Sequence, residues 1–101
     1  MIKETTILSG LEDTGTYETV DAFFVEHGLQ DWRAGEIKCF TDAGFDVTDS
    51  AKQQVRLSED GNSVVITVAY ADQAEKDTIL GNVTGDMPSG LISEMSETHL
   101  F

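Results

Sequence analysis

The chain has 101 residues, 40% of them hydrophobic, and 19 acidic against 6 basic side chains give it a net charge of −13. This length suits one domain, and we expect residues 1–101 to form a single unit. No apolar run approaches the ~18 residues of a membrane span, no N-terminal stretch resembles a signal peptide, and so few lysines and arginines argue against direct binding to nucleic acid or anionic lipid.

The charge is unevenly distributed along the chain. Residues 1–32 contain seven acids and only Lys3, residues 33–56 contain four charges of each sign, and residues 57–101 contain eight acids and only Lys76. Such an excess suits a basic partner or a high-salt environment. The plainest interpretation is a well-solvated surface, since net charge by itself favours solubility.

A strand and a helix are expected first along the chain. Residues 2–9 are rich in threonine and isoleucine and predict a strand. Residues 17–27 predict a helix with Thr16 as its N-cap and Gly28 as a left-handed C-terminal residue, after which Leu29 packs back on Phe24. The apolar stripe of this helix consists of Tyr17, Val20, Phe23, Phe24 and His27.

The next segment is less regular. Residues 30–36 are interpreted as a connection and residues 37–40, IKCF, as a short buried strand. Residues 41–50 are interrupted by Gly44, and the sequence leaves open whether they form a loop or a strand that continues past a bulge.

Residues 55–58 and 63–70 predict a β-hairpin. With Asp60 and Gly61 at the centre of a type I′ turn, Leu57 faces Val64 and Val55 faces Ile66. This register predicts an antiparallel sheet that is covered on one side only. Its apolar face holds Val55, Leu57, Val64, Ile66, Val68 and Tyr70, and its mixed face holds Arg56, Val65, Thr67 and Ala69.

The last part of the chain predicts one more helix and leaves the structure of its final residues open. Asp72 and Glu75 have capping-box spacing, so a short helix should run to Leu80 and end at Gly81. Residues 82–90 have a linker-like composition, and residues 91–101 form either a docking helix or a mobile tail.

The expected fold is therefore α+β: a mostly antiparallel sheet of three to five strands with one main helix, residues 17–27, packed on one face. A two-stranded ribbon is only marginally stable by itself. Residues 2–9 or 37–40 should therefore pair beside the hairpin.

Signatures of catalysis or cofactor binding are not recognisable in the sequence. The two histidines and Cys39 lack the spacing of metal ligands, no glycine cluster resembles a phosphate-binding loop, and no serine lies in a nucleophile elbow. We expect no cofactor, no metal and no catalytic residue, and His27 is interpreted as structural. A lone cysteine cannot form an intramolecular disulfide, which indicates a reducing compartment, the cytoplasm.

The acidic residues are the candidate partner-binding site. Ordered carboxylates would engage a basic protein, as an inhibitor or a nucleic-acid mimic does, because DNA itself presents one charge per ~1.7 Å. Trp32 is equally an interface anchor or a partly buried core residue. The first acidic row consists of Glu12, Asp13, Glu18 and Asp21, and the second of Glu59, Asp60, Asp72, Glu75 and Asp77.

Two other classes of function stay open. A structural or assembly subunit would associate through apolar contacts of Trp32 and residues 91–101, and that segment or an exposed strand edge would support a homodimer. A small dimeric α+β enzyme would need a pocket with a titratable residue near His27.

Overall fold

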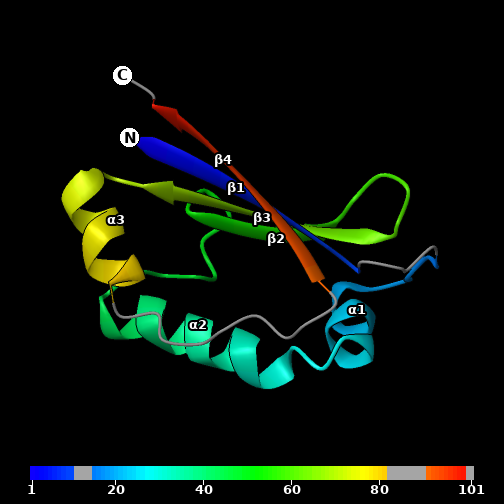
Figure 1. Ribbon diagram of the computed structural model, residues 1–101. Helices are drawn as coiled ribbons and strands as arrows, with labels where there is room; N and C mark the ends of the chain where they lie inside the picture. Colours follow the sequence, from blue (N-terminus) through cyan, green and yellow to red (C-terminus); the bar gives the residue numbers. More distant parts are fainter. Residues whose placement is uncertain (11–14, 82–90, 100–101) are drawn as a thin grey trace.

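The computed structural model describes residues 1–10, 15–81 and 91–99 (Figure 1). These residues form one four-stranded sheet and three helices, which confirms the predicted α+β class. The elements are β1 (Ile2–Gly10), α1 (Val20–Glu26), α2 (Gln30–Asp42), β2 (Gln53–Leu57), β3 (Ser63–Tyr70), α3 (Gln73–Leu80) and β4 (Leu91–His99).

All neighbouring strands are antiparallel, in the order β2-β3-β1-β4. The strands β1 and β2, which α1 and α2 connect, therefore run parallel with β3 inserted between them, and β3 and β4 enclose β1 in the same way. This is the split β-α-β arrangement. Figure 1 shows the three helices beneath one face of the sheet, so that the described residues leave the opposite face without a helix.

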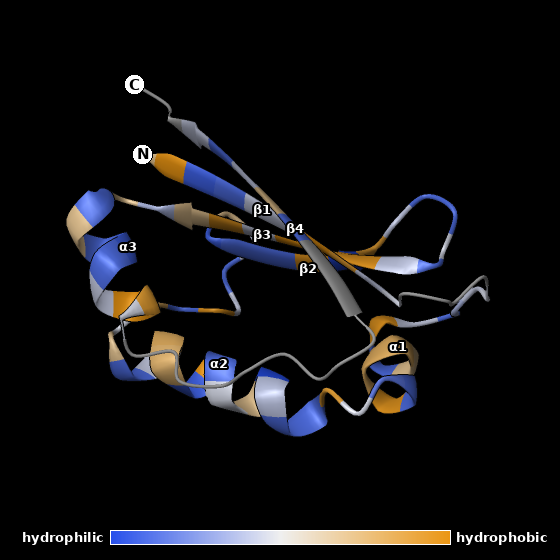
Figure 2. Ribbon diagram, viewed as in Figure 1, coloured by the Kyte–Doolittle hydropathy of each residue, from blue (hydrophilic) through white to orange (hydrophobic). Residues whose placement is uncertain are grey.

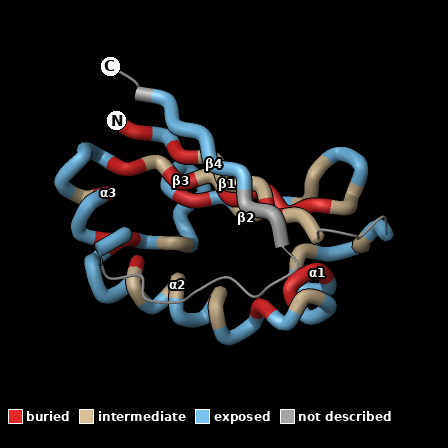
Figure 3. The backbone as a smooth tube through the Cα atoms, in the orientation of Figure 1, coloured by how far each residue is buried: buried red, intermediate tan, exposed pale blue. Residues whose placement is uncertain are grey.

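The covered face of the sheet supplies one side of the hydrophobic core. Alternate residues of β3, from Val64 to Tyr70, are buried against the helices, and Val55 and Leu57 of β2 pack beside them. Figures 2 and 3 show that hydrophobic and buried positions coincide along β3. The predicted division of the hairpin into an apolar and a mixed face is confirmed, since Arg56 on the other face is exposed.

The predicted register of the hairpin is confirmed, but its predicted turn is wrong. Leu57 pairs with Val64 and Val55 with Ile66. The Ser58 amide donates to the Ser63 carbonyl (2.8 Å), which leaves a four-residue loop over 59–62. A type I′ turn needs positive φ at both central residues, and among the described residues only glycines have it. A longer loop with the same centre leaves the strand pairing unchanged.

The first helix is shorter than predicted. It begins after Thr19, whose hydroxyl accepts a hydrogen bond from the Ala22 amide (3.1 Å), so Thr16 is not the N-cap. Its C-terminal end agrees with the prediction. Gly28 has φ +65°, and the Leu29 amide donates to the Phe24 carbonyl (2.9 Å) as in a Schellman motif.

The longest described helix, α2, was not predicted, and both interpretations of its sequence are wrong: residues 30–36 are not a connection and residues 37–40 are not a strand. Its inner stripe includes Arg33 and Glu36 as well as Ile37 and Phe40. Charged residues on the inner side weaken the helical hydrophobic pattern, and a short apolar run such as IKCF does not distinguish helix from strand.

A second Schellman motif ends α2. Gly44 has φ +81°, its amide donates to the Thr41 carbonyl (3.0 Å), and the Phe45 amide donates to the Phe40 carbonyl (3.0 Å). The rings of Phe40 and Phe45 then meet at 5.0 Å between centroids. The segment that the sequence left open is thus the end of a helix and the loop after it.

Gly35, within α2, and Gly44, just after its end, should respond in opposite directions to alanine. Gly44→Ala should lower the free energy of unfolding by ~1 kcal/mol, because an L side chain is strained at positive φ. Gly35→Ala, in the middle of the helix, should raise it by up to ~1 kcal/mol, since alanine is the better helix former and its Cβ meets no atom within 4 Å. Denaturant unfolding measures both, and shifts in the same direction would contradict this assignment.

The prediction for α3 is confirmed, whereas the prediction for the segment that follows residue 90 is wrong. The helix α3 has the predicted capping residue, since the Asp72 side chain accepts from the Glu75 amide (2.8 Å), and it ends at Gly81 as expected. Residues 91–99 are neither a docking helix nor a mobile tail but the edge strand β4, paired with β1 along its length. The predicted linker at 82–90 lies outside the described residues. Within the part of the chain that the structure describes, no helix is long and apolar enough to cross a membrane.

Candidate functional site

One hydrogen bond brings the start of α1 beside the β2–β3 loop. The Tyr17 amide donates to the Gly61 carbonyl (2.8 Å), although 44 residues separate them. Glu18 follows Tyr17 directly, and Glu59 lies in the same four-residue loop as Gly61. Glu18 of the first predicted acidic row and Glu59 of the second therefore share one end of the molecule, where Figure 1 shows α1 below the loop.

The second row itself is divided. Glu59 and Asp60 precede β3, whereas Asp72 follows it at the start of α3. The eight residues of β3 span ~23 Å at the usual rise of a strand. The structure thus places Asp72, Glu75 and Asp77 at the opposite end of β3 from the hairpin loop, and the second row does not form one continuous surface.

Several of the predicted acids stabilise local structure. Asp60 accepts hydrogen bonds from the Ser58 hydroxyl (2.6 Å) and the Asn62 amide (3.2 Å), which lower the pKa of its carboxyl. Asp72 caps α3, and Glu75 accepts from the Ala71 amide (3.1 Å).

Three predicted acids are free at the end where α1 meets the loop. The side chains of Glu18, Asp21 and Glu59 are exposed and make no hydrogen bond or ion pair with the described residues. Asp21 lies in the first turn of α1. We call these three side chains the acidic end.

An apolar groove adjoins the acidic end. Between α1 and α2 it has a volume of about 420 Å³. Val25, which lines it, is 59% exposed. The sequence does not indicate this groove, and the signal available there is that Val25 lies off the predicted apolar stripe of its helix. It is lined by Asp21, Phe24, Val25, Gln30, Arg33, Ala34 and Ile37.

Of the remaining predicted site residues, one packs on the core and two lie outside the described residues. Trp32 is partly buried and packs against the hydrophobic core. Glu12 and Asp13 belong to the segment that the structure does not describe.

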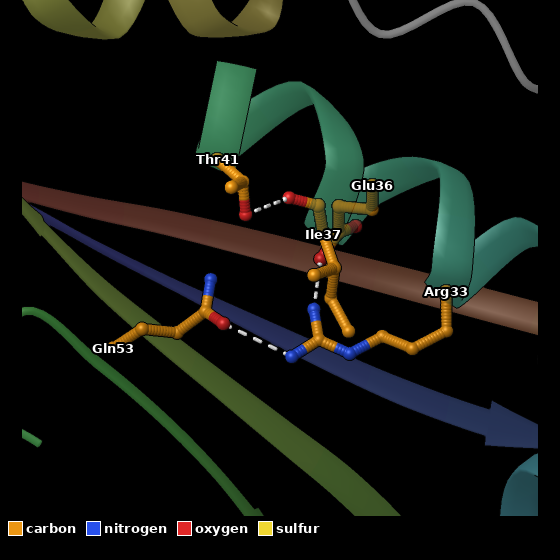
Figure 4. Close-up of polar contacts among 5 residues, drawn as sticks. All are labelled: Arg33, Glu36, Ile37, Thr41 and Gln53. Atoms are coloured by element: carbon orange, nitrogen blue, oxygen red, sulfur yellow. Dashed lines mark hydrogen bonds and ion pairs between the residues drawn. The ribbon is translucent and has the colours of Figure 1, made fainter. Parts of the chain in front are cut away.

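A polar cluster lies between the helices and the sheet (Figure 4). The Arg33 guanidinium donates to Glu36 (2.6 Å) and to the side-chain oxygen of Gln53 on β2 (2.9 Å). Burial raises the pKa of Glu36, and the nearby Glu4 adds to this rise, while Arg33 opposes it. Arg33 thereby links α2 to the sheet and compensates the charge of a partly buried carboxylate.

A second polar cluster joins β1, α3 and β4. Glu4 is only 5% exposed, and its Oε2 lies 3.3 Å from the Lys76 ammonium, which also donates a hydrogen bond to Glu97. The neighbouring Tyr70 hydroxyl is buried, and no described residue hydrogen-bonds it. Burial raises the pKa of Tyr70, and Glu4 and Glu36 contribute to the rise.

His27 has structural contacts. Its Nε2 lies 3.2 Å from the Tyr17 hydroxyl, and its ring packs on Phe23 with centroids 4.5 Å apart. Within the described ranges, no three His, Cys, Asp or Glu side chains are grouped so as to hold a metal ion.

Comparison of the chain with protein-family models, with curated proteins and with solved structures gives no match. The surface and the buried groups described above are therefore the basis for assigning a function.

Proposed function

We propose that the protein is a non-catalytic interaction protein whose acidic end binds a basic partner. The observation that carries this proposal is that Glu18, Asp21 and Glu59, free and exposed, share one end of the molecule, where Asp21 also lines the α1–α2 groove. Carboxylates without internal partners are available to lysine and arginine, and their summed field accelerates encounter with a cationic protein.

The groove supports a more specific proposal about the partner. Its apolar lining, with Phe24, Val25 and Ile37, suits one or two hydrophobic side chains, and aromatic or aliphatic anchors supply most of the affinity of protein interfaces. We therefore propose a basic segment that also carries an apolar anchor. The lone cysteine of the chain is compatible with the reducing cytoplasm, where we place this interaction.

An inhibitory role is one form of this function. A protein that occupies the basic groove of a nucleic-acid-binding partner would compete with its nucleic acid. The division of the second acidic row along β3 limits such a mimic to the acidic end, without the α3 carboxylates.

Salt dependence tests the proposal. The protein is immobilised, exposed to native lysate at ~20 mM salt and eluted by a gradient, since exposed charges are screened beyond ~8 Å at physiological ionic strength. We expect a basic protein to elute early, with an association rate that falls at least ~10-fold between low and physiological salt. Retention that is indifferent to salt would refute the proposal and support the apolar assembly subunit instead.

A C-terminal deletion does not test the apolar assembly subunit, which would associate through residues 91–101. Deleting residues 89–101 removes β4 from the sheet, so loss of association after this deletion would not distinguish a docking tail from damage to the fold.

A further inference from the structure

We propose that the open face of the sheet binds a small polyanion. A depression of about 300 Å³ lies on this face, across β1, β3 and β2. Its floor consists of Thr67 and Ala69 of β3, flanked by Lys3 and Thr5 of β1 and by Gln54 and Arg56 of β2. The side chain of Lys52, just before β2, also lines it.

The depression collects half of the basic residues of a strongly acidic chain, because Lys3, Lys52 and Arg56 are three of its six. The other three are paired with carboxylates. Arg33 lies 2.6 Å from Glu36, Lys38 lies 2.6 Å from Asp42, and Lys76 contacts Glu4 and Glu97.

The cations of the depression have no such partner. Neither Lys3 nor Arg56 forms an ion pair with a described residue. Lys52 lies near Asp46, whose pKa it helps to lower, and 5.4 Å above the Phe45 ring. The register puts the carboxylate of Glu94 on this face too, but opposite Ile7, at the β4 side of the sheet.

The neutral groups suit the same ligand. Thr5 and Thr67 occupy paired positions of β1 and β3 and both line the depression, and neither hydroxyl is used in a hydrogen bond with the described residues. They lie between Lys3 at one end of the depression and Arg56 at the other. Charge-assisted hydrogen bonds to carboxylate or phosphate oxygens are about twice as strong as neutral ones.

The size of the depression and the charge of the protein select a small ligand. At a net charge of −13 the molecule repels large anions at long range. Within the Debye length, the local cations dominate. The ligand class is therefore a compact molecule with two or more carboxylate or phosphate groups.

Titration with citrate and with inorganic pyrophosphate tests this site. Calorimetry or amide NMR shifts should show saturable 1:1 binding of at least one of them, and the one that binds more tightly identifies carboxylate or phosphate as the preferred group. Lys3→Gln and Arg56→Gln should each weaken binding by about tenfold, the value of one charge-assisted contact.

Lys38→Gln is the matched control. It removes the same single charge from an exposed site on α2 and should change the affinity by less than about twofold. Equal weakening by Lys38→Gln and Arg56→Gln would show a general charge effect and overturn the site. The site would also be overturned if neither anion saturates at about 10 mM. The same holds if the only effect of the anion is to dissociate self-associated copies of the chain. These experiments need no basic partner, so their outcome is independent of the acidic end.

Discussion

Replacing Lys76 by methionine should lower the free energy of unfolding by ~3 kcal/mol, because it leaves a buried carboxylate uncompensated. Glu4 is 5% exposed, and the Lys76 ammonium is the described cation that faces its Oε2. That oxygen has no hydrogen bond from any other described residue. Against a total stability of ~5–15 kcal/mol for a small domain, the loss is large.

The control for this variant is Lys38→Met. Lys38 forms an ion pair with Asp42 at 2.6 Å, but its side chain is 75% exposed. Exposed pairs contribute ~0–1 kcal/mol, so chemical denaturation should barely distinguish this variant from the parent. Adding Glu4→Gln to Lys76→Met should recover much of the loss, since the charge that lacked a partner is then gone. Equal effects of the two lysine variants would contradict a buried charge cluster.

The pH dependence of the same variant has a defined sign. The hydrogen bond to Glu97 raises the pKa of Lys76, against the opposing effect of burial. A raised pKa means that this stabilisation is complete below the unfolded value of ~10.4 and is lost as pH rises through the folded value. From neutral pH upwards, the difference in stability between the parent and Lys76→Met should therefore stay constant until strongly alkaline solution and shrink there.

Reversing the acidic end, with Glu18→Lys and Asp21→Lys together, should weaken binding of the basic partner by about 30-fold at low salt. Like charges placed against a cationic surface cost several kcal/mol and slow encounter. The fold should lose no more than ~1 kcal/mol, chiefly because Asp21 no longer interacts with the positive end of α1. Surface plasmon resonance and denaturation measure the two effects separately.

A second double variant separates position from total charge. Asp77→Lys with Glu94→Lys changes the net charge by the same amount, and both residues are exposed, on α3 and β4. We expect less than about threefold weakening from it. If binding survives the first double variant and high salt as well, the acidic end is not the binding surface.

Local signals were sufficient for a definite part of the fold. The hairpin register follows from the alternation in residues 55–70, the end of α1 from Gly28 with Leu29, and the start of α3 from Asp72 with Glu75. Each depends on contacts between residues close in sequence. The motif that ended α1 also ends α2 at Gly44 and Phe45, and applying it there would have located the end of that helix.

The candidate sites were less predictable, because they depend on distant segments. The sequence places Glu18 and Glu59 in separate rows, and the Tyr17–Gly61 hydrogen bond of the folded chain brings their two segments together. Lys3 and Arg56 line one depression only because β3 lies between β1 and β2.

By itself, the sequence determined an acidic α+β chain with a half-covered hairpin, since composition and short-range periodicity carry that information. Tertiary structure decided that residues 30–42 are helical, because the inward Arg33 and Glu36 are accommodated by pairing with each other and with Gln53. It also decided that residues 91–99 are a strand, because the hydrogen bonds of an edge strand come from its neighbour β1. The same packing brings distant segments together twice. It gathers Glu18, Asp21 and Glu59 at one end of the molecule, and it places Lys3 and Arg56 in one depression on the open face of the sheet.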